Sequence, residues 1–297
     1  MKIAANMDAL THTGKKKFSM KDAETKIEDL YTSDEDYAAL LADFHDDIDD
    51  LQSMMYAHNR YGMLVILQAR DAAGKDSTIK GVFSGVNPAG LRVISFKRPS
   101  ETELGHDFLW RTTIENPDRG TITVFNRSYY EEVLVCKVHP EIVTNYQQLP
   151  AEKLKDMDGF WQKRYEDIAN MEKYLHHNGI EVVKFYLNVS KEEQGNRLIS
   201  RIQDPKKNWK FQEGDLKERA LWKEYDKAYE DAINATATEN APWYVIPADD
   251  KKNMRLIICQ ILLKRLKALD MAYPAPDPAH KAKLESFIQT IEDQNNS

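Results

Sequence analysis

The sequence predicts a three-layer α/β fold in which a five-stranded, mostly parallel sheet carries helices on both faces. The first observation is a set of apolar runs without polar alternation, which is typical of strands covered on both sides. The second is that helical patterns separate these runs, as a parallel sheet requires. The third is a length of 297 residues with 42% hydrophobic and 30% charged side chains, which indicates a large folded unit.

The expected elements follow in chain order. An N-terminal arm is expected over residues 1–30, and its first 20 residues have little apolar pattern and are expected to be mobile or loosely docked. A helix then starts near Thr32 and Ser33, both candidate caps, and its apolar residues recur at spacings of three and four through Met55. The expected strands are 63–67, 91–96, 121–125, 181–189 and 243–247. Further helices are expected from about Ser77, Ser128, Phe160, Lys191 and Asp215, and over 251–271.

Charge and composition exclude several classes of protein. The chain has 41 Lys and Arg against 48 Asp and Glu, a net charge of −7, which argues against a nucleic-acid partner. No apolar run is long enough for a membrane span and no secretory signal is read, so a cytoplasmic protein without a membrane partner is expected. The two cysteines, Cys136 and Cys259, do not make a metal motif. Local basic clusters at 97–98, 197–201 and 206–210 indicate a site for a small polyanion.

The segment after the first predicted strand has the layout of a phosphate-binding loop. Residues 69–78 read ARDAAGKDST, between a strand and a helix start. Small residues let backbone N–H groups surround phosphate oxygens at the positive end of the helix, and Lys75 adds a mobile charge. The pattern departs from the usual one at Ala69 and Asp76, so an ordinary turn with a surface lysine is the alternative. The candidate phosphate ligands are Ala72, Ala73, Gly74, Asp76 and Ser77.

Three polar residues are expected at this loop, with Asp71 inside it and Asn126 and Arg127 facing it. Asp71 is the candidate ligand for Mg²⁺, which Mn²⁺ can replace, because a carboxylate opposes phosphate unless it holds a cation. The alternative for Asp71 is a turn-forming role. Asn126 and Arg127 follow the third predicted strand, where Asn126 contacts metal weakly or orients a water and Arg127 forks onto phosphate oxygens. The alternative for Arg127 is pairing with a neighbouring acid.

Four ordered motifs resemble the polyphosphate kinase type 2 family. They are RDAAGK at 70–75, SFKRPS at 95–100, HDFLWR at 106–111 and FNRSYY at 125–130, and the similarity spans roughly 30–266. The resemblance implies a P-loop kinase-like catalytic domain over 31–270 and a C-terminal tail over 271–297. It also implies transfer of phosphoryl groups between inorganic polyphosphate and nucleotides, and it is greatest to the subgroup that acts on both AMP and ADP, forming ADP and ATP.

The remaining basic and aromatic residues are interpreted in the light of that resemblance. Arg197 and Arg201 share a helix face, and the segment 197–216, with Lys206 and Lys207, resembles a lid that closes over phosphates. The alternative for this segment is a solvated charged surface. Lys97 and Arg98 are expected to clamp a donor or acceptor phosphate, or else to be surface charges. Trp110 and Arg111 are expected to contact the nucleotide, although the residues around them also suit a core.

The sequence thus predicts magnesium-dependent phosphoryl transfer, with Asp71, Lys75, Asn126, Arg127, Arg197 and Arg201 as its catalytic residues. A homo-oligomer is expected, because the resemblance implies self-association. Two other functions stay open. One is an ATP-dependent nucleoside or nucleotide kinase, and the other is a non-catalytic module that binds polyphosphate.

Overall fold

The computed structural model describes residues 3–296 and contains a six-stranded sheet in the order β1-β6-β5-β2-β4-β3. All neighbouring strands are parallel except β1, which pairs antiparallel with β6. The carboxyl ends of the five parallel strands therefore meet at one edge of the sheet. The strands are β1 (Thr11–His12), β2 (Gly62–Ala69), β3 (Leu91–Ser95), β4 (Ile122–Asn126), β5 (Ile180–Asn188) and β6 (Trp243–Pro247).

The α/β class and the mostly parallel sheet are confirmed, but the strand count is six rather than five. The additional strand, β1, lies in the N-terminal arm, which is packed against the body instead of loosely docked. Met7, Leu10 and Phe18 are buried, and the Phe18 N–H donates to the Asn234 side chain at 2.7 Å. A two-residue strand beside the four-residue helix α1 (Met7–Leu10) is too short to produce a periodic pattern, which explains why the sequence did not reveal it.

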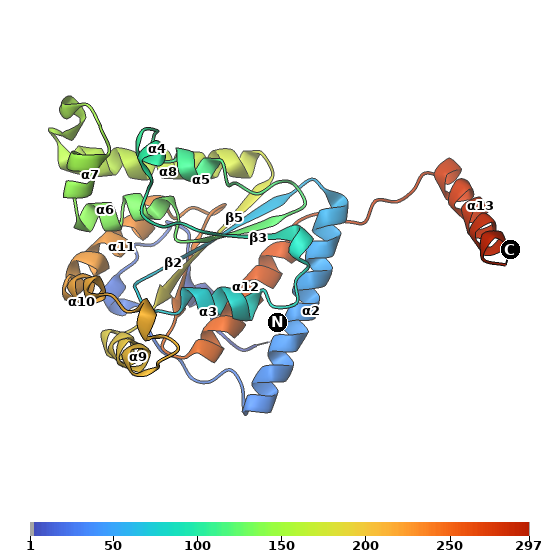
Figure 1. Cartoon of the computed structure of the whole chain (residues 1–297), viewed down its shortest axis with the longest axis horizontal. Helices are drawn as coiled ribbons and strands as arrows, with labels where there is room; N and C mark the ends of the chain where they lie inside the picture. Colours follow the sequence, from blue (N-terminus) through green and yellow to red (C-terminus); the bar gives the residue numbers. More distant parts are fainter. Residues whose placement is uncertain (1–2, 297) are drawn as a thin grey trace.

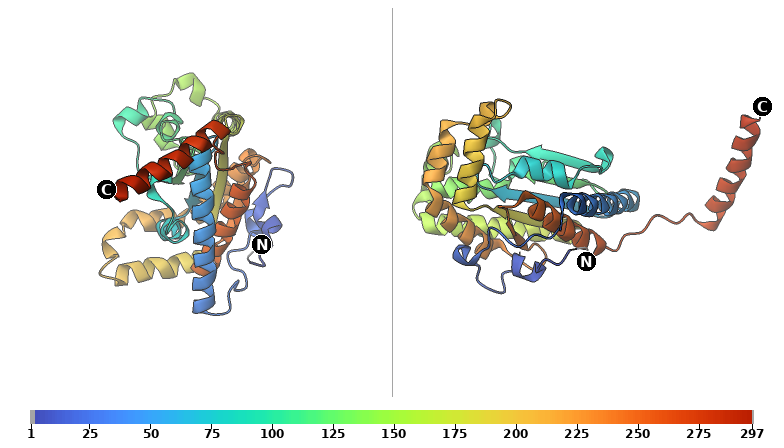
Figure 2. Two further views of the ribbon diagram at one scale, coloured as in Figure 1. Left: turned by 90° about the vertical axis from the view of Figure 1, so that its right-hand side faces the viewer. Right: turned by 90° about the horizontal axis from the view of Figure 1, so that it is seen from below.

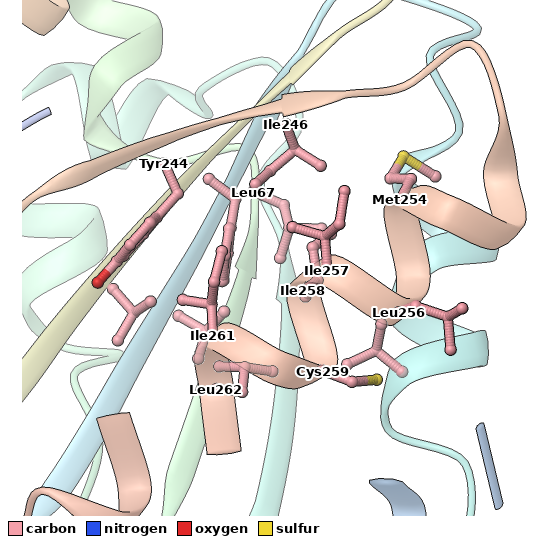
Figure 3. Packing of buried hydrophobic residues seen from close by; sticks show 14 of the residues in the cluster. Leu67, Tyr244, Ile246, Met254, Leu256, Ile257, Ile258, Cys259, Ile261 and Leu262 are labelled. Carbon is pink, nitrogen blue, oxygen red and sulfur yellow. The ribbon is translucent and has the colours of Figure 1, made fainter. Parts of the chain in front are cut away.

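One face of the sheet is covered by α2 (Asp34–His58), α3 (Lys75–Val82) and α12 (Lys251–Lys267). The α2 helix starts where expected, because the Ser33 hydroxyl accepts from the Asp36 N–H at 3.1 Å. Figure 3 shows apolar side chains of α12 packed with Leu67 and Ile246, which come from two strands of the sheet. This buried α12 holds α3, and hence the loop before it, against the sheet.

The opposite face is covered mainly by α8 (Met157–His177) and α11 (Trp222–Thr236). The helix expected from Ser128 is broken into a 3₁₀ helix (Tyr129–Glu132), α6 (Val135–Val138) and α7 (Glu141–Tyr146). Pro140 separates α6 from α7 because it lacks an N–H and disfavours a helical residue before it. The expectation of one helix here was therefore wrong in its continuity.

The remaining helices lie outside the two covering layers. The pair α9 (Lys191–Gln203) and α10 (Glu213–Ala220) projects at the end of the molecule opposite α13 (Pro278–Asn295), as Figures 1 and 2 show. No helix within 3–296 is both long and apolar enough to cross a membrane. The other helices outside the two covering layers are α4 (Glu101–Leu104), α5 (Trp110–Thr113) and the 3₁₀ helices Met20–Asp22, Pro88–Gly90, Ala151–Leu154 and Asn208–Lys210.

The strand order determines where a ligand can bind. The chain leaves β2 toward β3 at the sheet edge and returns to β4, so β2 lies between strands reached by crossovers in opposite directions. Such a switch point leaves a crevice beyond the carboxyl end of the strand. The loop that follows β2 lies in this crevice.

Candidate active site

The loop between β2 and α3 bends sharply through residues 70–74. Ala72 and Gly74 both have left-handed backbones, with φ of 60° and 107°. This conformation is strained for Ala72, whereas Gly74 has no β-carbon to oppose it. Gly74 then caps α3, whose first N–H groups lack partners within the helix and point into the bend. The bend therefore has the geometry of a phosphate-binding loop.

Arg70 anchors this loop to α11 and β5. Its guanidinium donates to the Tyr186 hydroxyl at 2.8 Å and to the Asp226 carboxylate at 2.5 Å. It also lies over the Trp222 ring, 4.0 Å from the centroid, and only 7% of the residue is exposed. Because several elements hold the guanidinium, the backbone that carries the next residue, Asp71, has a fixed position.

Lys75 is the first residue of α3 and folds back over the loop. Its Nζ donates to the Ala69 carbonyl at 2.7 Å and to the Arg70 carbonyl at 3.4 Å. Burial, with the neighbouring Arg127 guanidinium, lowers the pKa of Lys75 to about 8. Among the described residues, no carboxylate forms an ion pair with this ammonium group. An anion bound in the loop would supply that missing counter-charge.

Arg127 lies beyond the end of β4 and contacts two carboxylates. Its backbone is left-handed, with φ of 65°, and its N–H donates to the Leu67 carbonyl of β2 at 3.2 Å. One guanidinium nitrogen donates to Asp71 at 2.8 Å and the other to Glu131 at 3.5 Å. Burial raises the pKa of Glu131. Arg127 therefore pairs with neighbouring acids, which was the alternative in the sequence analysis, and it also lies beside the loop, as expected.

Asn126, the last residue of β4, contacts the other side of the loop. Its side-chain amide donates to the Asp76 carboxylate at 2.8 Å and to the Ser95 hydroxyl at 3.4 Å. Lys210 approaches the same Asp76 carboxylate from the lid segment, at 3.7 Å. The side chain of Asp76 is 72% exposed, so it stays open to a further ligand.

The two arginines of α9 have different surroundings. Arg197 donates to the Ala73 carbonyl at 2.6 Å and to the Ala248 carbonyl at 2.7 Å, so it ties the loop to the segment after β6. Arg201 is paired with Asp215 of α10 at 3.4 Å. The expected common face is observed, with Arg197 supporting the loop backbone and Arg201 directed at α10.

A groove of about 1110 Å³ runs along the carboxyl edge of the sheet, and we call it the basic groove. Its lining contains nine cationic side chains against three carboxylates, so its field favours a polyanion. The cations are Lys75, Lys97, Arg98, Arg127, Arg197, Arg201, Lys207, Lys210 and Lys251.

A second cavity, of about 490 Å³, adjoins the groove beyond β3 and β4, and we call it the apolar pocket. Phe96, Phe108, Ile142 and Tyr146 are among its lining residues, and Arg111 contributes a cation. Its volume suits a small organic ligand with an aromatic ring. A third cavity, of about 760 Å³, lies beside α10 and has lining residues in common with both of the others. The three cavities therefore form one continuous cleft.

The structure brings most of the predicted site residues to this cleft. Trp110 is an exception, because it stacks on His106 with ring centroids 4.0 Å apart and does not line any of the three cavities. Lys206 is also outside their linings, and Ala73 contributes only its buried carbonyl. The predicted residues on the cleft are Asp71, Ala72, Gly74, Lys75, Asp76, Ser77, Lys97, Arg98, Arg111, Asn126, Arg127, Arg197, Arg201 and Lys207.

Glu131, Lys210 and Lys251 are among the cleft residues that the predicted site did not include. Glu131 stands four residues after Arg127, and this helical spacing was the available signal that the two side chains pair. Lys210 belongs to the basic run whose earlier members were chosen. Lys251 begins α12 directly after the last strand, and its position at a carboxyl strand end was the available signal.

The carboxylates of the cleft suit Mg²⁺ bound together with a phosphate. Within the described chain, no group of three or more His, Cys, Asp or Glu forms a self-sufficient metal site. Mg²⁺ in phosphoryl-transfer sites uses one or two carboxylates and completes its shell with water and phosphate oxygens. Asp71 and Asp76 provide two such carboxylates on either side of Lys75, and both line the basic groove.

A strand, an anion-binding loop and a helix at the switch point of a parallel sheet, beside a cationic groove, define a P-loop phosphotransferase. The chain belongs to the polyphosphate kinase 2 family, whose model matches residues 31–274. It is 50% identical over 267 residues to a protein of Rhodopseudomonas palustris named ADP-polyphosphate phosphotransferase, covering 90% of this chain and 92% of that one.

Two further similarities agree with this assignment. A Meiothermus ruber protein named AMP/ADP-polyphosphate phosphotransferase is 45% identical over 232 residues, 78% of this chain and 82% of its own length. The crystal structure of polyphosphate kinase 2 from Arthrobacter aurescens superimposes with a TM-score of 0.83 at 36% identity. That match covers 96% of this chain and 98% of the other, so the whole architecture is similar.

Proposed function

We propose that this enzyme transfers a phosphoryl group between inorganic polyphosphate and AMP or ADP, forming ADP or ATP. The observation that carries the proposal is the continuity of the apolar pocket with the basic groove, which the phosphate-binding loop lines, through the shared residues Lys97, Arg98 and Arg127. A polyanion without a base and a nucleotide with one require these two environments side by side. The names of the R. palustris and M. ruber relatives support the same pair of substrates.

The reacting phosphates meet at the loop. The end of the polyphosphate chain binds the N–H groups at Gly74 and the Lys75 ammonium, which line the groove. The nucleoside occupies the apolar pocket, so its phosphates reach Lys97, Arg98 and Arg127, which line both the pocket and the groove. This arrangement assigns Lys97 and Arg98 to the nucleotide rather than to the distal polyphosphate.

In the reaction, an oxygen of the nucleotide's terminal phosphate bonds to the terminal phosphorus of the chain. The bond from that phosphorus to its bridging oxygen breaks, and the shortened chain keeps the electron pair. The attacking phosphate is already ionised near neutral pH, so positioning and charge neutralisation carry the catalysis. Arg127 neutralises negative charge on the phosphoryl group during its transfer. Arg201 does the same once its ion pair with Asp215 breaks.

Asp71 is the first candidate to hold Mg²⁺ (or Mn²⁺) against the phosphates, with Asp76 available beside it. A metal bound there would neutralise charge on the phosphate oxygens. Arg127 donates to one carboxylate oxygen of Asp71 at 2.8 Å, which leaves the other oxygen for a cation and keeps the guanidinium beside the phosphates.

The segment 197–216 acts as a lid over the phosphates within the catalytic domain of residues 31–270. It comprises the end of α9, a 3₁₀ turn and the start of α10, and it presents Lys207 and Lys210 to the groove. Closure would exclude water, which competes with the nucleotide for the activated phosphoryl group. Lys206 and Trp110 do not line the cleft, so phosphate binding by Lys206 and nucleotide binding by Trp110 stay predictions from the sequence.

The test mixes the purified protein with Mg²⁺, long-chain polyphosphate and either AMP or ADP, and follows ADP and ATP by chromatography. We expect both acceptors to be phosphorylated. ATP as donor with an AMP or nucleoside panel is the parallel arm, because turnover there without polyphosphate would identify an ATP-dependent kinase. Tight, salt-sensitive polyphosphate binding with no turnover in either arm would identify a non-catalytic module instead. A cytoplasmic location, self-association and the absence of a nucleic-acid partner stay predictions.

A further inference from the structure

The C-terminal helix α13 is held away from the rest of the molecule. Figures 1 and 2 show it at the end of an extended segment that follows α12. This segment, residues 270–277, contains Pro274 and Pro276, and prolines favour an extended, semi-rigid backbone. The Asp277 carboxylate then caps the helix by accepting from the His280 N–H at 2.8 Å. The matched family model ends at residue 274, so α13 lies outside the part of the chain that defines the family.

One face of α13 is apolar and exposed. Large apolar side chains recur there at spacings i, i+3, i+4 and i+7, which places them in one line along the helix. Each of them exposes between 43% and 57% of its surface. We call this set the α13 stripe, and its members are Leu284, Phe287, Ile288 and Ile291.

The opposite face of the helix is polar, and its side chains bond within the helix. Gln289 donates to the Asp293 carboxylate at 3.1 Å, and the Thr290 hydroxyl donates to the Ser286 carbonyl at 3.1 Å. Short helices are only marginally stable in water, and in proteins they depend mostly on the packing of an apolar face. The α13 stripe is therefore the surface through which this helix packs, while the polar face stays in water.

A second copy of the same helix suits the stripe better than two other occupants do. The extended segment holds the stripe away from the chain's own body. A helix that lies on an anionic membrane carries lysines over its polar face, whereas this polar face holds Ser286, Gln289 and Asp293. A second α13 presents an identical stripe, and a twofold axis lets the two stripes cover each other.

Charged residues beside the stripe determine how two copies can align. At 3.6 residues per turn, Lys281 and Glu292 flank the same edge of the stripe about three turns apart, and Lys283 flanks the other edge. In an antiparallel pair the twofold axis brings like edges together, so Lys281 of each copy lies beside Glu292 of the other. In a parallel pair unlike edges meet, and Lys281 would lie beside Lys283 of the second copy. Charge therefore favours the antiparallel pair.

We propose that α13 joins two copies of this chain, with its stripe packed antiparallel against the stripe of α13 in the second copy. The centre of the pair falls near Phe287 and Ile288, so Leu284 of one copy lies toward Ile291 of the other. The helices α9 and α10, beside the cleft, are at the opposite end of the molecule, so the pairing leaves both clefts open. The contact is independent of the proposed function.

The first test measures the mass of the full chain in solution, by light scattering after gel filtration, for the wild type, Ile288→Asp and Gln289→Asp. Both variants add one carboxylate to α13, but only the first adds it to the stripe. We expect the wild type to contain at least two copies, Ile288→Asp to have half the wild-type mass, and Gln289→Asp to match the wild type. A cooperative thermal transition in both variants should show that the body stays folded.

The second test measures the dissociation constant of the oligomer at low salt for Lys281→Glu, Glu292→Lys and the variant that carries both changes. Each single change replaces two opposite-charge contacts by two like-charge contacts, so association should weaken about three- to tenfold. The double variant exchanges the charges and should return to within about twofold of the wild type. The differences should shrink at high salt.

Several results would overturn the proposal. A monomeric wild type would show that the stripe does not join copies, and a wild-type mass for Ile288→Asp would show that another surface does. An equal loss of mass in Gln289→Asp would assign the effect to added charge rather than to the stripe. A double charge variant as weak as the single variants would exclude the antiparallel arrangement.

Discussion

Two lysines, one inside the sheet and one at its carboxyl edge, have opposite surroundings. Lys184, in β5, is fully buried, and its Nζ donates to Glu172 at 2.6 Å, to the Thr236 carbonyl at 2.9 Å and to the Tyr130 hydroxyl at 3.1 Å. Lys75, at the carboxyl edge, is partly open to the basic groove and donates only to backbone carbonyls among the described residues.

This difference shows how to distinguish a structural charge from a functional one. The ammonium of Lys184 has its hydrogen-bonding capacity filled by three protein oxygens, so no room is left for a ligand. The ammonium of Lys75 lacks a carboxylate partner and faces a cavity, so its charge is available to a phosphate. Four experiments test this contrast.

Lys75→Met should produce the largest change in activity. Loss of a positioned cation at the transferred phosphate is expected to lower kcat/KM for polyphosphate about 10²- to 10³-fold. The melting temperature should stay the same or rise, because the variant removes a partly desolvated charge that has no ion-pair partner in the described chain. Steady-state kinetics measures kcat/KM, and calorimetry measures the melting temperature. A variant that keeps more than a tenth of wild-type activity would contradict the assignment of Lys75 as the cation that binds the transferred phosphate.

Lys184→Met should lower the stability of the fold and leave activity unchanged. It leaves the Glu172 carboxylate buried without its counter-ion, so the free energy of unfolding is expected to fall by about 3–5 kcal/mol. Urea denaturation measures this value, and kcat per folded molecule should be unchanged.

The matched control for this experiment is the double variant Lys184→Met/Glu172→Leu, which removes both charges. It should recover most of the lost stability, since no unpaired buried charge remains. A single variant as stable as the wild type would show that the ion pair is not structural.

Asp71→Asn tests the carboxylate beside Lys75. Turnover with polyphosphate and ADP is expected to fall about 100-fold, and half-maximal activity should need more Mg²⁺, because the amide is a weaker ligand. Magnesium titrations at saturating substrates provide the measurement. Turnover near the wild-type value would remove Asp71 from the metal site. Asp226→Asn removes a carboxylate outside the metal site while Tyr186 and Trp222 still hold Arg70, so it should leave the magnesium requirement unchanged.

The smallest effect concerns pH. The pKa of Lys75 is lowered to about 8, so raising the pH through this value removes the charge that attracts phosphate. Polyphosphate affinity, measured without metal, should therefore decline from pH 7 to pH 9, by at most about tenfold because one pH unit above a pKa leaves about a tenth of the group protonated. Lys75→Arg should bind with no decline over the same range. A wild-type affinity independent of pH would show that the free ammonium does not titrate there.

The sequence predicted the parallel strands well because each is a local run of apolar residues. The segments 63–67 and 243–247 lie within or coincide with β2 and β6, and the loop at 69–78 is a contiguous motif that depends on neighbouring residues only. The Ser128 segment was interpreted incorrectly because Pro140 breaks the helix after it has begun. β1 was missed because its pairing with β6 is a long-range contact.

The site was predictable where its residues follow strands. Asp71, Lys75 and Arg127 each stand next to a strand end, so parallel topology alone brings them to one edge. Arg197 was chosen for its charge, but only the fold shows that it donates to the loop backbone at Ala73. Lys251 carries no local signal that separates it from Lys252.

The amino-acid sequence by itself determined the class of fold, the phosphate-binding loop and the family, because each depends on residues close together in the chain. Tertiary structure decided which charges are paired. Whether a lysine meets a carboxylate, as Lys184 meets Glu172, or faces a cavity, as Lys75 and Lys251 do, depends on segments that are distant in sequence. Since the energy of a charge depends on its partners and on access to water, only the folded chain separates the structural lysine from those available to phosphate.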